Sequence, residues 1–190
     1  MHEVTVCIPT FNGSDTIQKC LKSVQIQGVN ARIIVMDNGS TDGTLEMLQS
    51  AVKNGWYGNH DIEVHAGGRV PGGRPENIKH VRSKLAELVE TKFVLWLDDD
   101  IKLPPFALKL MMEMADVMPK LGCVGLHYQP FNGHMAVGAT LMQAGVAKQL
   151  TWDYKPGQPC ECNQAIEDIK KLGYEVQYMN KITALDLDYV

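Results

Sequence analysis

The sequence predicts an α/β fold with a mostly parallel central sheet and helices on both faces. Over the first 120 residues, short apolar runs rich in β-branched residues alternate with segments whose apolar residues recur every three or four positions. Strands and helices that alternate in this way form parallel sheets covered on both faces. The chain has 190 residues, enough for one well-cored domain and too few for two ordinary ones. We therefore expect a single domain over residues 1–190.

Three strand–helix units are predicted in the first half of the chain. Alternation over residues 4–8 and a continuous apolar run over residues 33–36 predict two strands, and Ile62 and Val64 indicate a third. The segments with helical periodicity are residues 14–27, with Ser14 as the N-cap, 41–54 and 76–90. Glycine and proline are frequent over residues 66–75, which predicts a loop.

The next predicted strand, residues 93–97, leads directly into three aspartates, Asp98 to Asp100. Pro104 and Pro105 then open a Met-rich helix whose apolar residues we expect to pack in the core. The remaining predicted elements are a strand over residues 123–128, a helix over 161–172 and a strand over 174–179.

Composition excludes several classes of protein. Apolar residues make up 45% of the chain and charged residues 21%, which is typical of a folded globular protein. The net charge of −4 argues against nucleic acid as the main partner. No apolar run approaches the roughly 18 to 20 residues that cross a bilayer, so we expect no transmembrane segment. The N-terminus lacks the basic start and apolar stretch of a signal peptide, which favours a cytoplasmic location.

The five cysteines include no Cys-x-x-Cys pair, so neither a disulfide framework nor a zinc knuckle is favoured. Cys160 and Cys162 are close in sequence, and we interpret them as structural or incidental thiols rather than as a metal pair.

Polar clusters follow three of the predicted strands, at residues 10–12, 37–42 and 98–100. Ligands of parallel sheets bind outside the carboxyl ends of the strands, so one site can collect all three clusters. Three successive aspartates would repel one another without a cation, and their hard oxygen atoms suit Mg²⁺ or Mn²⁺. The alternatives are a solvated turn for the aspartates, and a turn with a helix cap for residues 37–42.

Three segments together resemble the family 2 glycosyltransferases of the GT-A fold: residues 6–12, 34–44 and 93–100. Their order and spacing match that family over residues 3–118. The resemblance implies a Rossmann-like GT-A domain in which residues 1–120 bind the nucleotide sugar and a metal. Residues 121–190 would then form the acceptor side and carry the catalytic base.

The resemblance also implies roles for individual residues, because the family's first two motifs hold the nucleoside and its Asp-x-Asp motif meets the ribose and a metal. The implied nucleotide-sugar-binding residues are Pro9, Thr10, Asn12, Asp37, Asn38, Arg82, Asp98 and Asp99. Asp98 and Asp100 are the implied ligands of a divalent cation, Mn²⁺ or Mg²⁺. Arg82 falls where the family has a helix arginine that meets a diphosphate or the base, although a helix arginine can also be solvated.

The match to the family is poorest at the catalytic base. The family usually has a Glu-Asp pair opening a helix that ends in Gly-Tyr, and here Glu161 and Cys162 open such a predicted helix. Cys162 stands at the position of the usual catalytic aspartate, and a thiol with an ordinary pKa of about 8.5 is a poor substitute for a carboxylate. Glu161 is therefore the first candidate base and Asp153 the second. Either residue can also be a capping or solvated acid.

The implied function is transfer of a sugar from a nucleotide-sugar donor to a hydroxyl of an unknown acceptor, which is a glycan, a protein or a lipid-linked molecule. Inversion is the default outcome. One alternative is a degenerate, non-catalytic nucleotide-sugar-binding module, which Cys162 keeps open. A sugar-phosphate nucleotidyltransferase is less favoured, because residues 9–13 supply no Gly-rich, Arg-containing loop. A dinucleotide-binding oxidoreductase is disfavoured because no Gly-x-Gly-x-x-Gly follows the first strand.

Overall fold

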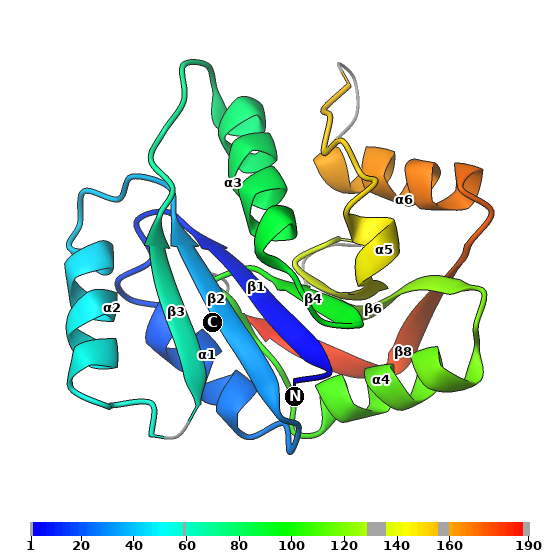
Figure 1. The fold of residues 1–190 in the computed structure, drawn as a ribbon, viewed down its shortest axis with the longest axis horizontal. Coiled ribbons are helices and arrows are strands. Elements are labelled where there is room, and N and C mark those ends of the chain that lie inside the picture. Colours follow the sequence, from blue (N-terminus) through cyan, green and yellow to red (C-terminus); the bar gives the residue numbers. More distant parts are fainter. Residues whose placement is uncertain (1, 59, 129–135, 156–159, 188–190) are drawn as a thin grey trace.

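A computed structural model of the chain describes residues 2–58, 60–128, 136–155 and 160–187. Within these residues the strands form one sheet in the order β3-β2-β1-β4-β7-β6-β8-β5 (Figure 1). The strands are β1 (Val4–Thr10), β2 (Ala31–Asp37), β3 (Asp61–Ala66), β4 (Phe93–Leu97), β5 (Ile101–Lys102), β6 (Leu121–Tyr128), β7 (Ala139–Gln143) and β8 (Glu175–Asp186). The helices are α1 (Ile17–Gln25), α2 (Thr44–Lys53), α3 (Arg74–Leu88), α4 (Ala107–Val117), α5 (Ala144–Ala147) and α6 (Glu161–Lys171).

The sheet is parallel in its first half and mixed in its second. Strands β3, β2, β1 and β4 pair in parallel. Strand β7 runs antiparallel between β4 and β6, and β8 is again parallel to β6. Figure 1 shows α3 in front of the sheet and α1 behind it. The predicted α/β architecture with helices on both faces is therefore confirmed.

The apolar runs in the sequence form the core of this sheet. Every residue of β4 is buried, as expected for a parallel strand covered on both faces. On α1, the buried apolar residues Ile17, Cys20, Leu21 and Val24 recur at helical spacing and form one face. Burial of these faces fixes the register of the strands, so the loops at their carboxyl ends meet at one edge.

Some predicted boundaries were wrong. Helix α1 begins at Ile17 and its N-cap is Thr16, whereas Ser14 lies in the preceding turn, where its backbone N–H donates to Asp42, 3.1 Å away. Strand β8 continues to Asp186, well beyond the predicted end at residue 179. Strand β5 and helix α5 were not predicted, because two and four residues are too few to show a periodic pattern. Among the described residues, none of the helices combines the length and the hydropathy needed to cross a membrane.

Candidate active site

A cavity of about 430 Å³ lies at the carboxyl ends of the central strands. It is lined from both halves of the chain, by the ends of β1, β2 and β4, by α3 and by the first residue of α6. The predicted site residues that it brings together are Pro9, Thr10, Asn38, Arg82, Asp98, Asp99, Asp100 and Glu161. Asn12, Asp37 and Asp153 do not line it.

Asn12 joins two loops of the site. Its side-chain oxygen accepts a hydrogen bond from the backbone N–H of Thr41 at 2.9 Å, and its own N–H donates to the Ser40 hydroxyl at 2.8 Å. Asn12 has a φ of 55°, a left-handed conformation that asparagine adopts more readily than most residues. The loop after β1 is thereby fastened to the loop after β2, and the Asn12 side chain is engaged within the protein.

Asp37 and Asn38 present acceptors that have no partner among the described residues. One carboxylate oxygen of Asp37 accepts from the N–H groups of Gly39 and Ser40, at 2.9 and 3.0 Å. The other oxygen of Asp37 and the side-chain oxygen of Asn38 are buried without a hydrogen bond to any described residue. A buried acceptor without a donor is costly, so both atoms are suited to N–H or O–H donors of a ligand.

The three aspartates after β4 have different surroundings. Asp98 accepts a hydrogen bond from Arg82 at 3.1 Å, and Asp99 accepts one from the hydroxyl of Thr10. Gly13 makes room for Asp99, because a Cβ at position 13 would overlap its carboxylate. Burial raises the pKa of Asp98, although Arg82 opposes this effect, and burial raises the pKa of Asp99 to about 6. Burial thus disfavours the ionised forms of Asp98 and Asp99.

Arg82 connects the aspartates to the candidate base. Its side chain is 3% exposed, and its guanidinium lies 3.1 Å from Asp98 and 3.6 Å from Glu161. The same group lies 5.4 Å from the ring centroids of both Trp96 and Trp152. Trp152 has a φ of 55°, which is rare for a bulky residue, and its ring packs edge-on against Trp96 at 4.8 Å. The alternative of a solvated helix arginine is therefore excluded, and the role of Arg82 in binding the donor stays a prediction.

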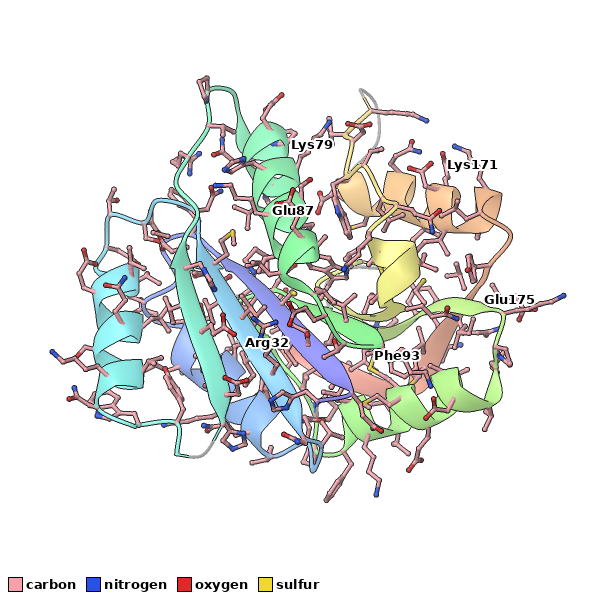
Figure 2. The ribbon with its side chains drawn as sticks, in the orientation of Figure 1. Arg32, Lys79, Glu87, Phe93, Lys171 and Glu175 are labelled. Atoms are coloured by element: carbon pink, nitrogen blue, oxygen red, sulfur yellow. The ribbon has the colours of Figure 1, made fainter. Side chains whose placement is uncertain are left out.

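The structure separates the two candidate bases. Glu161 begins α6 and reaches the cavity with a side chain that is 11% exposed. The neighbouring Cys162 faces the interior, where its sulfur accepts from the N–H of Val137 at 3.3 Å. Asp153 lies outside the cavity and pairs with Lys79 at 2.5 Å, a contact that lowers its pKa. This pair links α3 to the segment that precedes α6, on the side of α3 where Lys79 is labelled in Figure 2.

Six residues that line the cavity were not predicted from the sequence. They are Phe11, Arg69, Arg74, Asn77, Ile78 and Val81. The guanidinium of Arg69 stacks 4.3 Å from the centroid of the half-exposed Phe11 ring, and Arg74 is the first residue of α3. Arginines beside a glycine-rich loop that opens a helix are a recognisable signal for binding phosphate groups.

The cavity fits a hard divalent cation. Its acidic residues are Asp98, Asp99, Asp100 and Glu161, and its basic residues are Arg69, Arg74 and Arg82. Carboxylate oxygens are the ligands that Mg²⁺ and Mn²⁺ prefer. The raised pKa values of Asp98 and Asp99 indicate that added positive charge would stabilise their ionised forms.

Comparison with known proteins shows which family model and which relatives this chain matches. The family model described as glycosyl transferase family 2 matches residues 5–157. A teichoic acid poly(glycerol phosphate) polymerase from Staphylococcus epidermidis is 25% identical over 118 residues, which are 60% of this chain and 15% of that protein. A GalNAc(5)-diNAcBac-PP-undecaprenol beta-1,3-glucosyltransferase from Campylobacter jejuni is 28% identical over 121 residues, which are 61% of this chain and 35% of that protein.

Among solved structures, the mannosyltransferase PcManGT from Pyrobaculum calidifontis, in complex with GDP-Man and Mn²⁺, superposes with a TM-score of 0.76 at 15% identity. The match covers 98% of this chain and 57% of that one. The chain thus spans only part of the length of each of these proteins.

Proposed function

Because this chain belongs to glycosyl transferase family 2 and has the GT-A fold, we propose that it transfers a sugar from a nucleotide-sugar donor to an acceptor hydroxyl. One observation carries the proposal. A single cavity unites the loop after β1, the aspartates after β4 and the carboxylate of Glu161. A donor-binding site and a candidate base therefore lie within reach of one substrate.

The nucleoside binds at the loops after β1 and β2. The buried oxygens of Asn38, which lines the cavity, and of its neighbour Asp37, which does not line it, would accept hydrogen bonds from the base or ribose. Pro9 and Thr10 line the cavity together with Asn38, and Asn12 holds the two loops together. Arg69 and Arg74 are placed to meet the diphosphate, since arginine binds phosphate oxygens in a bidentate fashion.

The aspartates are the proposed ligands of the cation. Asp98 and Asp100 would hold it, while Asp99 is engaged with Thr10. When bound, the cation supplies positive charge that stabilises the departing nucleoside diphosphate. PcManGT, which shares the fold, was solved with Mn²⁺.

Glu161 is the proposed catalytic base. It accepts the proton of the acceptor hydroxyl while the hydroxyl oxygen bonds to the anomeric carbon and the bond from that carbon to the diphosphate breaks. One displacement of this kind inverts the anomeric centre. Arg82, 3.6 Å away, balances the charge of Glu161. In this proposal residues 1–120 hold the donor and the cation, and residues 121–190 contribute the acceptor side and the base.

The second candidate function is a nucleotide-sugar-binding module without turnover. It is favoured by Cys162, which replaces the usual acid and faces Val137 instead of the cavity. Turnover separates the two functions, because a binding module saturates with the donor but neither hydrolyses nor transfers the sugar.

A variant of Glu161 tests the proposal. Nucleotide sugars are first screened by thermal shift with and without Mn²⁺, since a ligand that binds only the native state raises its stability. With the donor found, Glu161→Gln should keep donor affinity and lose about 10²-fold or more in the rate of transfer or donor hydrolysis. Asp153→Asn is the matched control and should keep the rate. Full turnover in Glu161→Gln would exclude Glu161, and a loss confined to Asp153→Asn would transfer the role to Asp153.

A further inference from the structure

The first turn of α6 brings two thiols and a carboxylate together. The sulfur atoms of Cys160 and Cys162 and a carboxylate oxygen of Glu161 all lie within 4.8 Å of one another. We propose that these three residues form a Zn²⁺ site, distinct from the aspartate site, and that zinc bound there withdraws Glu161 from catalysis. The second half of this inference, inhibition by zinc, rests on the proposed role of Glu161. The first half, the zinc site itself, does not.

The geometry requires only small movements. In a tetrahedral zinc site with Zn–S distances of about 2.3 Å and Zn–O distances of about 2.0 Å, two sulfurs are about 3.8 Å apart and sulfur and oxygen about 3.5 Å apart. The two sulfurs therefore need to approach each other by about 1 Å at most, and a sulfur and the oxygen by about 1.3 Å at most. Cys160 has an extended backbone (φ −160°, ψ 170°) just before the helix, whereas Cys162 lies inside it. The fourth position of the tetrahedron is left for water.

The two cation sites differ in chemistry. Thiolates select zinc, whereas Mg²⁺ and Mn²⁺ prefer oxygen ligands. The aspartates offer oxygen alone, and the start of α6 offers two sulfurs with one carboxylate. The two kinds of ion are therefore expected to sort between the two sites even when both are present.

The surroundings suit a zinc site with two thiolates and one carboxylate, which carries one net negative charge. Arg82 lies 3.6 Å from Glu161 and supplies the opposite charge. The N–H of Val137 already donates to the sulfur of Cys162, and outer hydrogen bonds of this kind orient metal ligands. Cys162 is buried, but Cys160 is only partly so and offers a route of entry from solvent.

The other cysteines provide a control. Cys7, Cys20 and Cys123 are buried in the core. Among the described residues, Cys160, Glu161 and Cys162 make up the group in which three His, Cys, Asp or Glu side chains place their ligand atoms close enough together for one ion. Cys7, Cys20 and Cys123 therefore provide thiols of the same chemistry that do not belong to such a group of ligands.

Cobalt(II) serves as a spectroscopic probe for zinc. The reduced, metal-free protein is titrated with Co²⁺ and then with Zn²⁺, and the near-ultraviolet absorption of a thiolate–cobalt bond is followed. On adding Co²⁺ we expect this absorption in the wild type and in Cys123→Ser, together with release of protons from the thiols. The absorption should then be lost when Zn²⁺ displaces Co²⁺. Cys160→Ser and Cys162→Ser should each weaken Zn²⁺ binding at least tenfold. Absence of thiolate–cobalt absorption in the wild type, or unchanged Zn²⁺ affinity in Cys160→Ser, overturns the site.

Cys160→Ser changes a partly exposed residue, so it keeps the test valid if Cys162→Ser fails to fold. For the second half of the inference, transfer is measured at saturating Mn²⁺ with added Zn²⁺. Zinc should inhibit the wild type but not Cys160→Ser, each compared with its own zinc-free rate. If zinc binds through the thiolates without inhibiting, the second half is wrong. If no transfer occurs under any condition, the proposed function fails while the cobalt spectrum still decides the site.

Discussion

Replacing Asp99 by asparagine should stabilise the protein in the absence of metal and donor. Burial raises the pKa of Asp99 in the folded state from 3.8 to about 6. Below about pH 4 the carboxyl group is protonated in both the folded and the unfolded chain, so it has no effect on the pH dependence of stability. Between pH 4 and pH 6 the unfolded chain ionises first, and stability falls as the pH rises. Above pH 6 the loss is complete.

The size of the loss follows from the shift. One pKa unit corresponds to about 1.4 kcal/mol, so a rise of about two units costs the wild type about 3 kcal/mol at pH 8. Asparagine avoids this cost and keeps a side-chain oxygen that accepts the hydroxyl of Thr10, the present partner of Asp99. Asp99→Asn should therefore exceed the wild type by about 2 to 3 kcal/mol in its free energy of unfolding at pH 8.

Urea denaturation in the presence of a chelator measures this difference at pH 4, 6 and 8. The advantage of Asp99→Asn should be small at pH 4, grow up to pH 6 and then stay constant. Asp15→Asn, a change at an exposed residue, is the control and should stay within about 0.5 kcal/mol of the wild type. An equal stability of Asp99→Asn and wild type at pH 8, or an advantage that shrinks as the pH rises, would refute the reasoning.

Three further variants address the remaining groups of the site. Asp100→Ala should abolish Mn²⁺-dependent donor binding but leave the fold intact, and calorimetry showing unchanged affinity with Mn²⁺ would remove Asp100 from the cation site. Asp37→Ala should weaken donor and free nucleoside diphosphate alike, by about 1 to 3 kcal/mol or roughly five- to 150-fold; a titration in which only the donor weakens would contradict its placement at the nucleoside. Arg82→Met leaves Asp98 and Glu161 without their shared cation, so urea denaturation should show a loss of about 3 to 5 kcal/mol. A loss below about 1 kcal/mol would mean that Arg82 is not a structural link.

The overall fold was accessible from the sequence because it depends on periodic apolar patterns. The runs over residues 33–36 and 93–97 are fully buried within β2 and β4. The rule that parallel strands end at one edge also correctly brought Thr10, Asn38 and the aspartates together. These features follow from local pattern and topology alone, without knowledge of any particular contact.

The directions of individual side chains were not accessible in the same way. Whether Asp99 points to Thr10, or Asn12 to Thr41, depends on contacts between residues far apart in the chain. The same holds for Asp153, whose partner Lys79 lies 74 residues away on α3. Arg69 and Arg74 carried a usable signal, a basic glycine-rich loop before a helix, but their place in the cavity depends on how that loop folds.

The hydrogen bonds between the loops after β1 and β2 affect the conformational entropy that is lost when a ligand binds. The backbone N–H groups of Asn12, Ser14 and Thr41 each donate to a side chain of the opposite loop. A flexible loop would lose conformational entropy on closing around a nucleoside, and that loss would be subtracted from the affinity. Here the ordering has already taken place during folding. Nucleoside binding should therefore not carry this cost of ordering the loops, and the backbone of these loops should have the same course in the free and the bound protein.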